Sequence, residues 1–153
     1  MKIDTFTTIT HGFAPPNEYI LNNSNGYPWV TPQDLSQQQT KYINNGKRSL
    51  SDTVVAINRL HRIEKGSLLL STRCPAGILA VANSDCYIGN GILSIVPNPY
   101  ICDSEYFYYV LMANMDSFVQ KASAGRFVQL TKGQLSNAKV TLPTLEKQKK
   151  LSN

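Results

Sequence analysis

The sequence predicts a single α+β domain with a mixed or antiparallel sheet, one long helix packed on that sheet, and the start of a C-terminal helix of the coiled-coil type. Three continuous apolar runs, at 67–71, 76–82 and 91–96, predict buried strands. A helical pattern over 104–121 follows them. The length of 153 residues suits one domain that buries roughly 70% of its unfolded surface.

Shorter elements precede the buried strands. Residues 3–9 alternate loosely between apolar and polar side chains, and residues 27–30 are aromatic and β-branched, so both predict strands. Residues 31–35 predict a capped helical turn, because Thr precedes Pro32 at the first helical position. Residues 36–52 are polar and predict a loop.

The long helix is predicted from the spacing of its large apolar residues. They recur at intervals of four, four and three, at Phe107, Leu111, Met115 and Phe118. This spacing puts the four side chains on one face, which we expect to pack on the sheet. The aromatic run 106–109 is therefore better explained as core and core edge than as a platform for stacking bases.

The last thirty residues predict a basic loop with a small helix near Gly133, a strand edge at 140–142, and a helix capped by Thr144. We place a domain boundary here, with 1–143 as the domain and 144–153 as the start of a spacer helix. About ten residues are too few for a stable isolated helix. We therefore expect this segment to fray or to be stabilised by a contact with another chain.

Catalytic, metal and cofactor sites find no support in the sequence. The two histidines stand in no metal or nucleophile pattern, the carboxylates are scattered, and the three cysteines lack CxxC spacing. No apolar run approaches the ~20 residues that cross a bilayer, and the N-terminus lacks the apolar core of a signal peptide. We expect a cytoplasmic, non-catalytic protein without a cofactor and without a membrane partner.

Positive charge is concentrated in two blocks of the chain. The net charge is +5, and the isoelectric point is about 9.2. Residues 41–73 carry seven basic and two acidic residues, and residues 104–153 carry seven basic and three acidic residues. A fold that joins the blocks makes one basic face, the usual footprint of a nucleic-acid binder. Two separate solvated surfaces are equally compatible with the charge pattern.

Candidate nucleic-acid contacts lie in segments predicted as loops or strand ends. They are of the types that hold phosphates and read base edges, although each is also an ordinary surface residue type. The candidates are Thr31, Gln33, Lys41, Lys47, Arg48, Arg73, Lys121, Arg126, Gln129 and Lys132.

Taken together, these segments resemble a known family. Residues 25–35, with Tyr-Pro-Trp-Val and Asp-Leu, resemble the signature of target recognition domains in the specificity subunits of type I restriction-modification systems. Residues 62–71 and 76–82 are similar to the family's Gly-containing strand and the strand after it. Residues 123–135 and 142–148 resemble its last loop and the beginning of its conserved helix. The resemblance covers about residues 1–151.

The sequence departs from the family pattern at two places and in length. The usual Asn-Gln before the third strand is replaced by Gly89-Asn90-Gly91, and Pro143-Thr144 replaces Pro-Pro. Family subunits contain two such domains joined by two long antiparallel helices. This chain resembles one domain with the first turns of one helix, so we expect a half subunit, a shortened gene product or an isolated domain.

The resemblance implies a non-catalytic DNA reader. In the family, each domain recognises one half of a split target in double-stranded DNA, separate modification subunits methylate adenine, and a motor subunit restricts. The implied partners are double-stranded DNA, modification (methyltransferase) subunits, and a second half-subunit or another copy through the C-terminal helix. Two alternatives stay open. In the first, the chain is a decoy that docks on a modification subunit without reading DNA. In the second, it is the recognition domain of a single-chain methyltransferase-nuclease.

Overall fold

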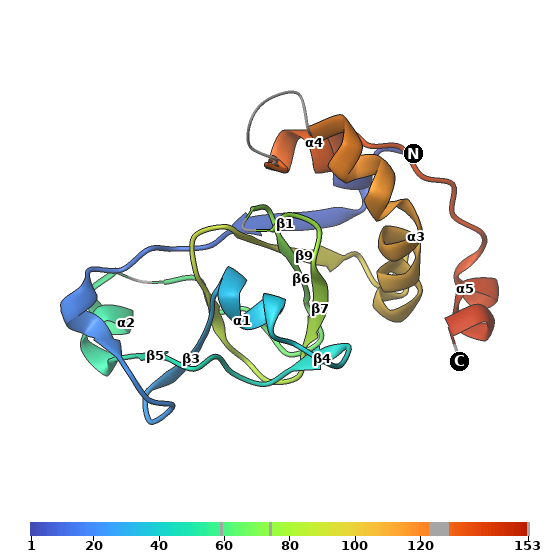
Figure 1. Cartoon of the computed structure of the whole chain (residues 1–153). Coiled ribbons are helices and arrows are strands. Elements are labelled where there is room, and N and C mark those ends of the chain that lie inside the picture. Colours follow the sequence, from blue (N-terminus) through green and yellow to red (C-terminus); the bar gives the residue numbers. More distant parts are fainter. Residues whose placement is uncertain (59, 74, 123–128, 153) are drawn as a thin grey trace.

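The computed structural model describes residues 1–58, 60–73, 75–122 and 129–152 as an α+β domain (Figure 1). Its short helices are η1 (Ile3–Thr5), η2 (Asn17–Tyr19), α1 (Pro32–Ser36), α2 (Asp52–Asn58), α4 (Lys132–Asn137) and α5 (Leu145–Ser152), and its long helix is α3 (Ser104–Ala122). Its strands are β1 (Thr7–His11), β2 (Ile20–Leu21), β3 (Tyr27–Val30), β4 (Tyr42–Ile43), β5 (Ser49–Leu50), β6 (Leu68–Ser71), β7 (Leu79–Ala82), β8 (Tyr87–Ile88) and β9 (Ile92–Pro97). None of the helices in these ranges is long and apolar enough to cross a membrane.

The predicted α+β class with mixed strand pairing is confirmed, but the strands form two sheets where the sequence predicted one. The larger sheet has the order β1-β9-β6-β7-β4, in which only the β4–β7 pair is parallel. The smaller sheet has the order β2-β5-β3-β8, and its β3–β8 pair is parallel. In Figure 1 the larger sheet lies between helices α3, α4 and α5 on one side and the small sheet with α2 on the other.

Strand β6 is buried on both faces, and it separates two apolar clusters. Leu68 and Leu70 point into the cluster that α3 covers, and Leu69 between them belongs to the cluster under α1. Successive side chains of a strand point to opposite faces, so an uninterrupted apolar run is the expected sequence of such a strand. This confirms the predicted buried strand at 67–71.

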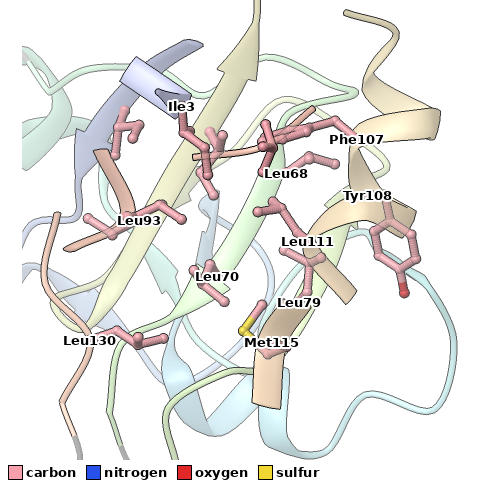
Figure 2. Packing of buried hydrophobic residues seen from close by; sticks show 14 of the residues in the cluster. Ile3, Leu68, Leu70, Leu79, Leu93, Phe107, Tyr108, Leu111, Met115 and Leu130 are labelled. Atoms are coloured by element: carbon pink, nitrogen blue, oxygen red, sulfur yellow. The ribbon is translucent and has the colours of Figure 1, made fainter. Parts of the chain in front are cut away.

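Helix α3 packs on the sheet as its periodicity predicted. Phe107 and Leu111 are fully buried, Met115 is buried, and Figure 2 shows Leu111 and Met115 directed at Leu68, Leu70 and Leu79. The fourth predicted core position behaves differently. Phe118 is only partly buried, although it packs against the same cluster. The prediction that Phe118 lies on the packed face of the helix is confirmed, but its side chain is not fully buried.

The short elements were the least predictable. Residues 3–9 form η1 followed by the start of β1, and Lys139 makes one isolated bridge to Lys2 where a strand edge was expected at 140–142. Strands β4, β5 and β8 have two residues each and were not predicted. A two-residue strand carries no periodic pattern and forms only because the tertiary fold brings a partner strand beside it.

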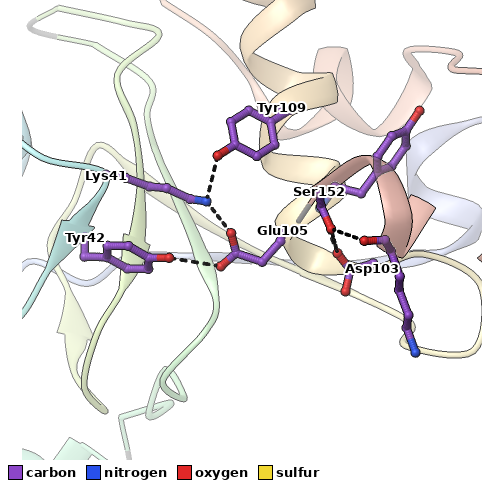
Figure 3. A network of polar contacts seen from close by, with 8 residues as sticks. Lys41, Tyr42, Asp103, Glu105, Tyr109 and Ser152 are labelled. Atoms are coloured by element: carbon purple, nitrogen blue, oxygen red, sulfur yellow. Dashed lines mark hydrogen bonds and ion pairs between the residues drawn. The ribbon is translucent and has the colours of Figure 1, made fainter. Parts of the chain in front are cut away.

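Lys41 joins the edge strand β4 to the beginning of α3. Its Nζ forms an ion pair with Glu105 and donates a hydrogen bond to the hydroxyl of Tyr109 at 3.3 Å, as Figure 3 shows. The ammonium also lies over the rings of Tyr108 and Tyr109. Burial alone lowers the pKa of Lys41, but the bonds to Glu105 and Tyr109 outweigh it, so its pKa lies above the ordinary value.

Helix α5 is docked on the beginning of α3 by a buried glutamine. The side chain of Gln148 has no exposed surface, accepts a hydrogen bond from the amide of Asp103 at 2.8 Å, and donates to the carbonyls of Ile101 and Pro143 at 3.1 and 2.9 Å. The Ser152 hydroxyl adds a bond to the Asp103 carboxylate at 3.2 Å (Figure 3). Thr144 was predicted as the cap of this helix, but the helix was expected to fray or to need a contact with another chain, and its docking within the chain was not predicted.

We predict that Leu111→Ala destabilises the domain by about 2–5 kcal/mol, because it leaves a cavity between α3 and β6. The matched control is Met112→Ala on the exposed side of the same turn, which should change the free energy of unfolding by less than about 0.5 kcal/mol. Urea denaturation of both variants measures the difference. Equal effects would contradict the packing described here.

We predict that Gln148→Ala releases α5 from α3. The substitution leaves one buried amide and two carbonyls without their partner, which costs about 1–3 kcal/mol. Hydrogen exchange of the α5 amides should accelerate in this variant, while the neighbouring exposed position Lys149→Ala leaves exchange unchanged. Rapid exchange of α5 already in the wild-type chain would show that the glutamine does not hold the helix.

Candidate nucleic-acid interface

The backbone of Thr72 brings three separate chain segments together where β6 leaves the sheet. Its amide donates a hydrogen bond to the carbonyl of Gly91 at 2.8 Å, and its carbonyl accepts one from the amide of Leu130 at 2.8 Å. Thr72 itself is buried. Arg73, Asn90 and Gln129 are each one residue away from these bonds, so their Cα positions are fixed relative to one another.

These three residues line one groove with a volume of about 230 Å³. His11 from the end of β1 and Lys132 from the first turn of α4 lie on the same groove. Arg73 belongs to the first basic block of the sequence, and Gln129 and Lys132 belong to the second segment that supplied candidates. The structure therefore joins part of the two basic blocks at this point.

Gly91 connects the groove to helix α1. A Cβ on Gly91 would lie 2.9 Å from Cγ of Pro32 and 3.3 Å from Nε of Arg73, and its φ of +93° is in the region that favours glycine. The first turn of α1 and the Arg73 side chain thus pack on either side of a residue that must have no side chain. This contact places the exposed Gln33 on the element next to Arg73.

The carboxylate of Asp34 organises α1 and the segment after β4. It accepts bonds from the amide and hydroxyl of Thr31 at 2.9 Å each, and from the amide of Lys47 at 3.0 Å. Thr31 in turn accepts from the Asp34 amide, which completes a capping box. The Thr31 side chain is therefore occupied in the helix cap, whereas the side chain of Lys47 is exposed.

Arg48 extends the same surface beyond Lys47. Its guanidinium lies over the ring of Trp29, 5.1 Å from the ring centre, and the side chain is partly exposed. Such a contact holds an arginine in place without neutralising its charge. We use the name α1–groove surface for the candidates that lie on or beside α1 and for those that line the groove: Gln33, Lys47, Arg48, Arg73, Gln129 and Lys132.

Three candidates lie elsewhere or outside the described ranges. Lys41 is bound to Glu105 at the beginning of α3, and Lys121 lies at the end of the same helix, sixteen residues or about 24 Å away. Lys121 lines a second hollow of about 310 Å³ with residues of α4. Arg126 falls in 123–128, outside the part of the chain that the structure describes.

The polar groove residues that were not among the sequence candidates include His11 and Asn90. His11 was considered only as a metal or nucleophile residue, and no local pattern marks it as the end of a strand that borders a groove. Asn90 did carry a signal, since it stands between two glycines in Gly89-Asn90-Gly91. That turn was interpreted as a departure from the family pattern, and no contact was assigned to Asn90.

The family comparison agrees with this architecture. The family described as type I restriction modification DNA specificity domain matches residues 1–152. Over 153 aligned residues, the chain is 28% identical to the type I restriction enzyme MjaIX specificity subunit of Methanocaldococcus jannaschii. Over 150 residues it is 25% identical to a putative specificity subunit, MjaX, of the same organism.

Solved structures show the same fold. The chain superposes with a TM-score of 0.75 on the HsdS subunit from Thermoanaerobacter tengcongensis, at 23% identity over 99% of this chain. It superposes with a TM-score of 0.78 on a chain from a study of complex assembly in the type I R-M system, and with 0.70 on the S subunit from M. genitalium.

The chain spans about a third of the length of these relatives. It covers 35% and 33% of the two archaeal subunits and 34% of the subunit from T. tengcongensis, while 97–99% of the chain itself is aligned. This proportion is consistent with one target recognition domain of a larger subunit. The chain belongs to the type I restriction modification DNA specificity domain family.

Proposed function

We propose that this chain is a non-catalytic DNA-recognition module that reads one half of a bipartite target through the α1–groove surface. The observation that carries the proposal is the position of Arg73. The buried strand β6 ends at Ser71, and Arg73 is the first charged side chain beyond it that borders the groove. Arginine in such a fixed position suits two-pronged pairing with guanine in the major groove.

The charges of the α1–groove surface are free to meet phosphates. The ion pairs found among the described residues join Lys41 to Glu105, Arg62 to Asp85, and Lys150 to Glu146. None of them involves Lys47, Arg48, Arg73 or Lys132. Basic side chains that have no acidic partner are available to neutralise DNA phosphates and release the condensed counterions. Binding is therefore strong at low salt and weak at high salt.

The surface divides by chemistry into two kinds of contact. Arg73, Gln129 and Gln33 carry the paired donors and acceptors that read base edges. Lys47, Arg48 and Lys132 carry positive charge that holds the phosphate backbone and sets the register. Arg126 is a further base-contact candidate, and Lys121 is a phosphate-contact candidate beside α4. Thr31 acts through the cap that positions α1.

In the complete system, DNA reading by this domain directs separate subunits. We propose that the chain works with modification (methyltransferase) subunits and pairs with a second specificity half or another copy through α5. The family assignment and the docked beginning of α5 support this arrangement. The described residues that gather in the groove are suited to hydrogen bonding and charge pairing, which supports a role in binding rather than in catalysis.

We predict that DNA binding by the purified chain falls steeply with salt and depends on Arg73. If four phosphates are neutralised, the logarithm of the affinity should fall with the logarithm of salt concentration at a slope of about −3.6. Arg73→Ala should cost about 1–3 kcal/mol on preferred sequences and less on others. Fluorescence anisotropy with a duplex library selected by the wild-type chain measures both quantities.

The matched control is Arg62→Ala. It also removes one arginine, but this arginine precedes the N-terminal end of β6, away from the groove, and pairs with Asp85. We expect this variant to bind like the wild-type chain. Binding without salt dependence, or equal losses in both variants, would contradict the reader. Docking on modification subunits without DNA binding would then support the decoy alternative.

We predict that Lys132→Ala weakens binding to all sequences alike and makes the salt slope shallower by about one unit, as the loss of one phosphate contact does. Lys65→Ala is the control, because Lys65 is equally an exposed lysine but lies before β6 and away from the groove. A change of sequence preference in Lys132→Ala, with an unchanged slope, would assign Lys132 to base reading instead.

A further inference from the structure

The turn between β8 and β9 presents one side chain to the groove, that of Asn90. The amide of Ile92 closes the turn on the carbonyl of Gly89 at 3.3 Å. A Cβ on Gly89 would lie 3.3 Å from the Trp29 ring, and one on Gly91 would meet Pro32 at 2.9 Å. A side chain is therefore excluded at Gly91, where φ is also +93°, and would be tightly packed at Gly89, while Asn90 itself is exposed.

The turn is held rigidly against the rest of the interface. The amide of Gly89 donates to the carbonyl of Val30 at 2.7 Å, directly before the N-cap of α1, and the carbonyl of Gly91 accepts from the amide of Thr72 at 2.8 Å, directly before Arg73. Asn90 therefore stands between the beginning of α1 and Arg73 with little freedom of its backbone. A group held in this way loses little conformational entropy when it binds.

The amide group of Asn90 is available for a ligand. It makes no hydrogen bond to any residue in the described ranges, whereas the side-chain amides of Asn83, Asn114 and Asn137 each donate one within the protein. An asparagine amide offers one donor and one acceptor side by side. This pair matches N7 and the N6 amino group of adenine in the major groove.

We infer that Asn90 is a specificity-determining residue that reads an adenine next to the base contacted by Arg73. The inference rests on the proposed function and deepens it, because it assigns a base to a residue outside the original candidates. Asn-Gly is also a common turn dipeptide, so a purely structural reason for Asn90 exists and must be separated from base reading.

Selection of binding sites from a random duplex library by the full chain separates the two roles. Asn90→Gly keeps a residue that favours turns, and Asn90→Asp keeps the size but removes the donor. Both variants should lose a preference for adenine at one position by about tenfold, and they should keep the preference at the position that Arg73→Ala relaxes. Thermal melting checks that the fold is intact.

The control is Asn25→Asp, which makes the same chemical change in another Asn-Gly dipeptide, before the end of β3 that is remote from α1. It should leave the selected sequence unchanged. Selective binding with an unchanged adenine preference in Asn90→Gly, or an equal weakening on all sequences, overturns the inference and leaves the proposed function standing. The loss of a preference for another base also overturns it. Failure of the wild-type chain to bind DNA rejects the proposed function and this inference together.

Discussion

The two backbone hydrogen bonds of Thr72 are the constraint on which the candidate interface depends. Strand β6 is buried on both faces, so its direction is fixed by two apolar clusters before the chain reaches Thr72. The Thr72 amide and carbonyl then fix the turn at Gly91 and the segment at Leu130. Gly91 and Leu130 lie about twenty and sixty residues after Thr72 in the sequence. The backbone bonds of Thr72 bring the side chains next to them to one groove.

Two groups of charged residues in the described ranges have different tasks. Lys41 and Glu105 satisfy each other where β4 meets α3, and Asp34 uses its carboxylate to hold α1 and the Lys47 amide. These groups maintain the fold. The cations of the α1–groove surface have no acidic partner among the described residues, so the same sequence keeps a rigid framework and leaves positive charge at the interface.

The elements that could be predicted from the sequence are those formed by local interactions. Long apolar runs and helical spacing identified β6, β7, β9 and α3, and Thr31 with Pro32 identified α1, because each signal lies within a few residues. Arg73 was found for the same reason, as a charge just beyond a buried run.

Other features depend on tertiary contacts. Phe118 keeps the helical spacing but is only partly buried, and Gln148 is buried only because α5 meets the Asp103 amide. Asn90 and His11 enter the groove through pairings that span many residues, and the ion pair of Lys41 with Glu105 joins positions 64 residues apart.

The central claim is that DNA binds where Thr72 organises the chain. Its most direct test is a titration of the ¹⁵N-labelled chain with its selected duplex, followed by amide chemical shifts. We expect the largest changes at Gln33, Arg73, Asn90 and 129–132, and changes confined to the exposed side of α3 and to α5 would contradict the account.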